Sequence, residues 1–174
     1  MHPMSILRLV KQNLAKSPEA PSSTETVRKI ARELDKLDAN HAKFIACFAY
    51  LLGRTACADL EISREETSMM EKIIMEKGGL PEEQAVIVVQ MAKTQNLLFG
   101  GTEDYLVARE FREMASLKER LALLDCLFSI AASQDSISTV EDNEISQIAD
   151  ELRIEHRDFI AIRSRYRDHL AVLK

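Results

Sequence analysis

Residues 58–66 read Ala-Asp-Leu-Glu-Ile-Ser-Arg-Glu-Glu, and residues 135–141 read Asp-Ser-Ile-Ser-Thr-Val-Glu. We call these stretches the first and the second junction. Both contain Ile-Ser-x-x-Glu, and each follows a segment that is apolar along most of its length. Methionine or isoleucine recurs four and seven positions after each glutamate, which is the spacing of one helical face. The repeat therefore predicts two related helical hairpins, each of which turns at an acidic junction.

The serine and the glutamate of each junction are suited to begin a helix. In a capping box, the serine side chain accepts a hydrogen bond from the third helical residue, and the glutamate at that position accepts one from the serine amide. The pattern stands at three predicted helix starts, as Ser63–Glu66, Ser116–Glu119 and Ser138–Glu141. It predicts helices that begin near residues 64, 117 and 139, and it requires no function to explain it.

The whole chain is typical of an all-α bundle of about seven to eight helices. It has only 5 glycines and 4 prolines, and 5% of its residues are aromatic, which disfavours an all-β fold. Apolar spacing and breaks predict helices over about 25–38, 40–57, 64–78, 81–97, 102–114, 117–132, from 139, and over 156–171. Gly100-Gly101 is interpreted as a break between two of them.

The N-terminal region, residues 1–23, differs from the domain predicted for residues 24–174. Residues 1–16 have the pattern of a short amphipathic helix, and residues 17–23 contain two prolines and three serines, as a linker does. Such a helix is too short to be stable alone, so we expect it to pack on its own bundle or on a second copy in a homodimer. The alternative is that it engages a membrane surface or a partner.

Charge and hydropathy restrict the class of protein. The net charge of -5 argues against nucleic acid as a partner, because a basic footprint is missing. The longest apolar run, residues 44–52, is shorter than the roughly 20 residues that cross a bilayer, and no signal-peptide core is present. Three widely spaced cysteines are typical of reduced thiols. We expect a cytoplasmic protein, which basic segments at its two ends could still bring to a membrane surface.

The sequence around the two junctions contains more acidic residues than helix capping explains. Residues 121–152 contain seven acids and no lysine or arginine. Carboxylates repel one another, and a divalent cation such as Ca²⁺, Mg²⁺ or Mn²⁺ relieves that repulsion through oxygen ligands. The candidate ligands are Asp59, Glu66, Asp135 and Glu141, with Glu61, Glu65, Asp142 and Glu144 at the rim. The alternative is a set of capped helices with a solvated acidic face and no metal.

At these residues the chain resembles the tellurite-resistance TerB-like domains. Members pair two helical hairpins whose junctions read roughly Ala-Asp-Gly-x-Ile-Ser-x-x-Glu, which the first junction matches except that Leu60 replaces the glycine. Ser136 replaces the glycine of the second junction, which is one residue shorter between its aspartate and its isoleucine. The residues after it also resemble the closing segment of the family: Glu141, Ile145, Ile148-Ala149, Leu152, Ile154 and Asp158-Phe159.

The resemblance implies a function without catalysis. It implies divalent metal binding through these acids and a protein partner in a stress-response complex at the inner membrane face. A metal-free helical adaptor is the alternative. A hydrolase that uses paired carboxylates is disfavoured, because the chain lacks HExxH, Cys/His metal spacing and a phosphate-binding glycine loop.

Overall fold

The computed structural model describes residues 24–174, and over that range it contains seven α-helices and no strand. The prediction of an all-α bundle is confirmed. The predicted N-terminal helix and linker lie outside the described residues. The helices are α2 (Glu25–Arg32), α3 (Ala39–Ala56), α4 (Arg64–Gly78), α5 (Glu82–Met114), α6 (Leu117–Ala131), α7 (Thr139–Glu151) and α8 (His156–Arg163). Short 3-10 segments are η1 (Ala132–Gln134), η2 (Ser164–His169) and η3 (Ala171–Leu173).

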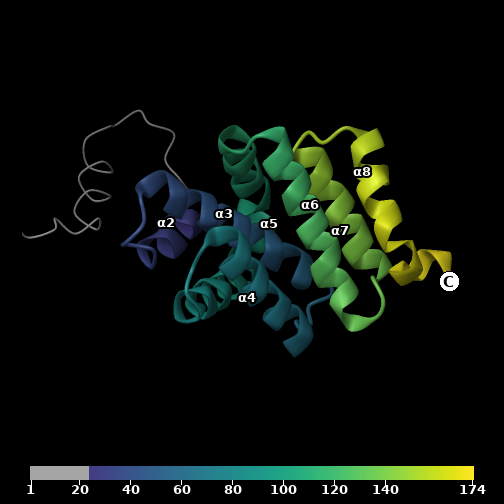
Figure 1. The fold of residues 1–174 in the computed structure, drawn as a ribbon, viewed down its shortest axis with the longest axis horizontal. Helices are drawn as coiled ribbons and strands as arrows, with labels where there is room; N and C mark the ends of the chain where they lie inside the picture. The colour runs from purple at the N-terminus through teal and green to yellow at the C-terminus, as the bar shows by residue number, and fades with distance from the viewer. Residues whose placement is uncertain (1–23) are drawn as a thin grey trace, which may run out of the picture.

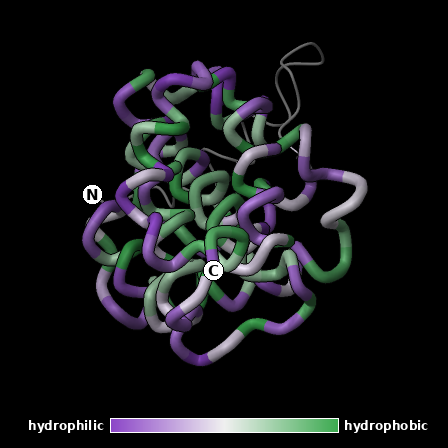
Figure 2. The backbone as a smooth tube through the Cα atoms, turned by 90° about the vertical axis from the view of Figure 1, so that its right-hand side faces the viewer, coloured by the Kyte–Doolittle hydropathy of each residue, from purple (hydrophilic) through white to green (hydrophobic). Residues whose placement is uncertain are grey.

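Helix α3 is the centre of the bundle. Thirteen of its 18 residues are buried, because a helix that is apolar nearly all round must be covered on every side. It contacts α2, α4, α5, α6 and α7. Helices α6, α7 and α8 lie side by side in the C-terminal part of the molecule (Figure 1). Figure 2 shows hydrophobic positions toward the middle of the molecule and hydrophilic ones on the outer turns. Over residues 24–174, no helix is both long and apolar enough to span a membrane.

Helix α5 runs without interruption through Gly100-Gly101, so the prediction of two helices over 81–97 and 102–114 is wrong. Each glycine lowers helix stability by about 1 kcal/mol relative to alanine. Packing outweighs this cost, because buried residues flank the glycines on both sides. The amides of Thr24 and Thr26 also donate to Glu110 and Glu103 on the second half of α5.

Two other helices are shorter than predicted. Helix α2 ends at Arg32 rather than at 38, and the next residues form turns. Helix α8 ends at Arg163 rather than at 171, because the chain after it finds a different hydrogen-bonding partner. The amide of Ile137 donates to the carbonyl of His169 (2.7 Å), and the amide of Ala171 donates to the carbonyl of Ile137 (3.0 Å). The C-terminal segment is therefore attached to the second junction.

Candidate functional site

Both junctions fold locally as capping boxes. The carboxylate of Glu66 accepts a hydrogen bond from the Ser63 amide (2.9 Å), and the Ser63 hydroxyl accepts one from the Glu66 amide (3.1 Å). Ser138 and Glu141 repeat the arrangement at 2.8 and 3.2 Å. The same motif starts α6 at Ser116. The three helix starts predicted from the sequence are confirmed.

The two junction glutamates also meet each other in the interior. Glu66 is fully buried and Glu141 is 4% exposed, although glutamate is rarely buried without a cationic partner. Burial and, to a smaller extent, the nearby charge of Glu141 together raise the pKa of Glu66 to about 7, against the hydrogen bonds from Ser63. Among residues 24–174, Glu66 Oε1 has no hydrogen-bond partner. We call these two side chains the Glu66–Glu141 pair.

The other acids of the first junction lie at the surface, outside the pair. Asp59, Glu61 and Glu65 are exposed, and Asp59 Oδ1 accepts a hydrogen bond from the Glu61 amide (3.1 Å). Asp135 of the second junction is exposed as well. Within the described part of the chain, no group of three or more His, Cys, Asp or Glu side chains is arranged to hold a metal ion. The structure thus brings Glu66 and Glu141 together and leaves Asp59 and Asp135 apart from them.

Two of the predicted rim acids, Asp142 and Glu144, are neutralised by distant arginines. Asp142 accepts two hydrogen bonds from Arg163, at 2.8 and 2.6 Å, and Glu144 pairs with Arg54. The hydrogen bond with Asp142 raises the pKa of Arg163. The interpretation that the acids of residues 121–152 lack compensating positive charges is wrong for Asp142 and Glu144. Their compensating charges come from arginines outside that range.

The backbone conformation shows which residue of each junction stands at the glycine position of the family pattern. Leu60 and Asp135 have left-handed backbones, with φ of 69° and 72°, and each lies two residues before the isoleucine of its junction. Asp135, rather than Ser136, therefore occupies the position of the family's glycine. A left-handed backbone costs roughly 1–2 kcal/mol for most residues, and aspartate tolerates it better than leucine does.

An ion-pair network around Arg54, which was not predicted from the sequence, holds the two hairpins together. Arg54 is 4% exposed on α3 and donates to both carboxylate oxygens of Glu151, at 2.6 and 3.1 Å. It also pairs with Glu144 and with Asp104 (3.5 Å), and Asp104 accepts a hydrogen bond from the Tyr50 hydroxyl (2.6 Å). Burial raises the pKa of Asp104, against the effect of Tyr50 and Arg54. The network joins α3 to α5 and α7. The one available signal was a lone arginine inside the most apolar helix.

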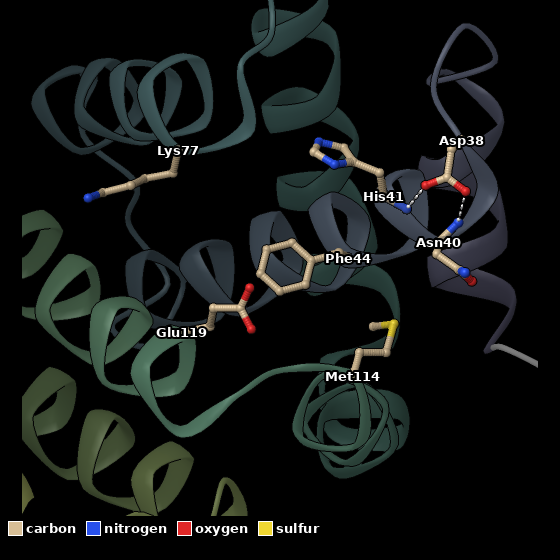
Figure 3. A pocket seen from close by; sticks show the side chains of 7 residues that line it. All are labelled: Asp38, Asn40, His41, Phe44, Lys77, Met114 and Glu119. Atoms are coloured by element: carbon tan, nitrogen blue, oxygen red, sulfur yellow. Dashed lines mark hydrogen bonds between the residues drawn. The ribbon is translucent and has the colours of Figure 1, made fainter.

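A cleft of about 610 Å³ lies at the other end of α3 from the first junction. It is lined by Asp38, Asn40, His41, Phe44, Lys77, Met114 and Glu119 (Figure 3). Its polar groups mostly hold helix ends: Asp38 accepts from the amide of His41 (3.0 Å), Glu119 completes the capping box of α6, and His41 Nε2 lies 3.3 Å from the carbonyl oxygen of Gly78. We therefore place the candidate site at the Glu66–Glu141 pair, where the buried Oε1 atom of Glu66 has no hydrogen-bond partner among residues 24–174.

One of the comparisons with known proteins gave a match. A protein-family model described as "Tellurite resistance protein TerB" matches residues 44–164, a range that contains both junctions and the pair. The comparisons with curated proteins and with solved structures gave no match.

Proposed function

The chain belongs to the TerB family, and from that premise we propose that it is a non-enzymatic domain that binds a divalent cation between its two hairpins. In this proposal the domain mediates protein contacts in a stress-response complex of the tellurite-resistance type. The observation that carries the proposal is the Glu66–Glu141 pair, in which two carboxyl groups are buried beside each other. A hard divalent cation relieves such repulsion and prefers oxygen ligands.

The donor set fits such an ion in two respects. Glu66 Oε1 is buried and lacks a hydrogen-bond partner among residues 24–174, so a carboxylate oxygen is free to accept a cation. One or two protein carboxylates commonly hold Mg²⁺, with water in its remaining positions. Glu66 and Glu141 would hold the ion, and the exposed carboxylates of Asp59, Glu61 and Glu65 would raise the local concentration of cations. The bound cation would supply charge neutralisation between the hairpins.

A metal-free adaptor is the second candidate, and a specific observation favours it. The described residues contain no cluster of three or more ligands, and the pKa of Glu66 is about 7. A single proton can therefore neutralise half of the pair near physiological pH. In that case the two junctions serve as a scaffold.

The surface around the junctions supports a role in protein contacts under either candidate. Leu60 is 82% exposed on the first junction, and Val140 is 53% exposed on the first turn of α7. Leu60 presents its side chain to solvent from a left-handed backbone, which aspartate or glycine would adopt at lower cost. An apolar partner surface, on another protein or on a second copy at the inner membrane face, would cover such side chains.

Thermal melting in the presence of cations tests the proposal. An ion that binds only the folded chain stabilises it by about 2.7 kcal/mol at 100 times its dissociation constant. We expect Mg²⁺, Ca²⁺ or Mn²⁺ at millimolar concentration to raise the melting temperature of the natural chain but not of Glu66→Gln. Glu119→Gln is the matched control, because Glu119 belongs to an exposed capping box of the same form. An unchanged melting temperature with all three ions would favour the metal-free adaptor.

A further inference from the structure

Helix α5 carries an uncharged row of side chains along its exposed side. The row recurs at alternating steps of three and four residues, which is the heptad spacing of a helix that packs along another helix. Its large members Ile87, Leu98 and Tyr105 are 47%, 65% and 52% exposed. Large apolar side chains that lie open to solvent in a row usually mark a contact surface. We call the row the α5 seam, and its residues are Gln84, Ile87, Met91, Thr94, Leu98, Gly101 and Tyr105.

Helix α2 packs on the other side of α5. The Thr24 amide donates to Glu110 (2.7 Å), and the Thr26 amide donates to Glu103 (3.3 Å). With 3.6 residues in each turn, Glu103 and Glu110 lie on the side of the helix away from the seam. Helix α2 therefore leaves the seam open to a partner.

The seam is complementary to itself when two copies of the helix run antiparallel. A twofold axis beside residue 96 places each residue opposite the one that lies equally far on the other side of residue 96. The facing pairs are Ile87–Tyr105, Met91–Gly101 and Thr94–Leu98. Two of these three pairs combine a large side chain with a small one, so the helices can approach without a clash or a gap. In a parallel pair Gly101 would face Gly101, and Tyr105 would face Tyr105.

Nothing inside the domain accounts for the glycine at position 101. A Cβ atom at Gly101 would meet no atom within 4 Å, and its φ is not positive. Neither packing nor backbone conformation within residues 24–174 therefore requires glycine there, although glycine lowers helix stability relative to alanine. In the antiparallel pair, the missing side chain makes room for Met91 of the second copy.

The charges at the two ends of the seam favour a second copy in the same orientation. Glu83 lies just before the seam and Arg109 just after it, and both are exposed. Neither takes part in an ion pair among residues 24–174. An antiparallel pair brings the acidic end of each seam to the basic end of the other, whereas a parallel pair would bring like charges together, which is costly. A partner that carries charge of one sign would match only one of the two ends.

We propose that two copies of the chain associate through their α5 seams as an antiparallel helix pair, with Leu98 and Gly101 near its middle and Glu83 and Arg109 at both of its ends. The seam is about 27 Å long from Ile87 to Tyr105. One helix pair of this length is a small interface, so the dimer dissociates on dilution. The proposal goes beyond the cation site and uses none of its residues.

Sedimentation equilibrium of the full chain in EDTA, from micromolar to near-millimolar concentration, tests the interface. We expect the mean mass of the natural chain to rise with concentration toward that of a dimer. Leu98→Asp should raise the dissociation constant of the dimer at least about tenfold, because the seam would bury an unpaired carboxylate. Ile160→Asp introduces the same charge at a 43% exposed position of α8, and this matched control should leave the dissociation constant unchanged.

Cysteine cross-linking tests the antiparallel orientation. Ile87 of one copy faces Tyr105 of the second copy, whereas the two Ile87 residues lie about 27 Å apart along the helices. A short thiol-specific cross-linker should therefore join the double variant Ile87→Cys, Tyr105→Cys into a covalent dimer. Neither single variant should exceed the natural chain, which gives the background from its own cysteines, of which Cys47 and Cys126 are buried.

Three outcomes would overturn the proposal. A natural chain that remains a monomer at every concentration would show that the seam does not bind a second copy. A dimer that Leu98→Asp leaves unchanged would place the interface elsewhere on the molecule. Cross-linking of either single variant as efficiently as the double variant would contradict the antiparallel orientation. Melting curves verify that the variants fold, as expected for changes at exposed positions.

Discussion

Glu66 and Glu141 hold equivalent positions in two related hairpins, and each caps its own helix while it meets the other inside the molecule. One carboxylate oxygen of each glutamate serves the local capping box. The other oxygen of Glu66 has no partner among the described residues. A residue type that stabilises a helix start thus also creates a buried repulsion between the hairpins. That repulsion is the basis of the cation proposal.

Glu66→Gln should make the chain more stable at alkaline pH when no divalent cation is present. Burial and Glu141 raise the pKa of folded Glu66 from 4.5 to about 7, so the folded chain holds its proton more tightly than the unfolded chain does. The contribution of Glu66 to stability is therefore full below pH 4.5 and is lost as the pH rises to about 7. Glutamine keeps the capping acceptor and removes the charge.

Urea denaturation at pH 5 and pH 8 in EDTA checks this prediction. We expect the stabilisation by Glu66→Gln to be about 1–3 kcal/mol larger at pH 8 than at pH 5. Glu119→Gln should show no such difference, since Glu119 is exposed. A pH-independent effect of Glu66→Gln would mean that the pKa of Glu66 is not raised in the folded chain.

Ser63→Ala and Ser138→Ala should each destabilise the chain by about 1 kcal/mol, because each removes the acceptor for one helix-start amide. Both changes also remove a hydrogen-bonding residue next to the Glu66–Glu141 pair. Ser116→Ala removes the same cap at an exposed site that lacks the pair, so it measures capping alone. Urea denaturation would give the three values. A loss well below that of Ser116→Ala would show that the junction serines do not act as caps.

Leu60→Gly should stabilise the chain by about 0.5–1 kcal/mol. Glycine adopts the φ of 69° without the clash that leucine suffers, although it adds entropy to the unfolded state. Leu60→Ala removes most of the same exposed side chain but keeps the strain, so it should bring no such gain. Melting curves of the two variants would separate strain from exposure. Equal melting temperatures would contradict the assignment of strain to Leu60.

Arg54→Ala should destabilise the chain by about 3–5 kcal/mol, because it removes the guanidinium group that pairs with Asp104, Glu144 and Glu151. Arg163→Ala breaks an ion pair at a more exposed site and should cost about 1 kcal/mol or less. Chemical denaturation of both variants gives the comparison. Similar losses for the two would mean that the Arg54 network does not join the hairpins as described.

The sequence predicted the local features of the fold correctly. The capping boxes and the helices that they begin depend on residues three positions apart, so short-range chemistry determines them. The apolar pattern of residues 40–57 is likewise local, and it accounts for the burial of α3. Gly100-Gly101 misled the prediction, since the packing that holds α5 together involves Thr24 and Thr26, which lie 86 and 77 residues before their partners on α5.

The parts of the candidate site that depend on tertiary packing could not be predicted. Arg54 finds Glu144 and Glu151 at separations of 90 and 97 residues, so a charge count along residues 121–152 could not include it. The alignment of the second junction with the first could not be predicted from the sequence either. Counting from the aspartates aligned Asp135 with Asp59, whereas the left-handed backbone aligns Asp135 with Leu60.

Counting bound Mn²⁺ by electron paramagnetic resonance would show whether the Glu66–Glu141 pair binds a divalent cation. The signal of free Mn²⁺ disappears when the ion binds, so a titration gives the number of sites and their affinity. If the pair binds the ion, we expect one site in the natural chain and in Glu119→Gln, with loss of that site in both Glu66→Gln and Glu141→Gln. Absence of binding by the natural chain, or unchanged binding by the two pair variants, would contradict the cation proposal.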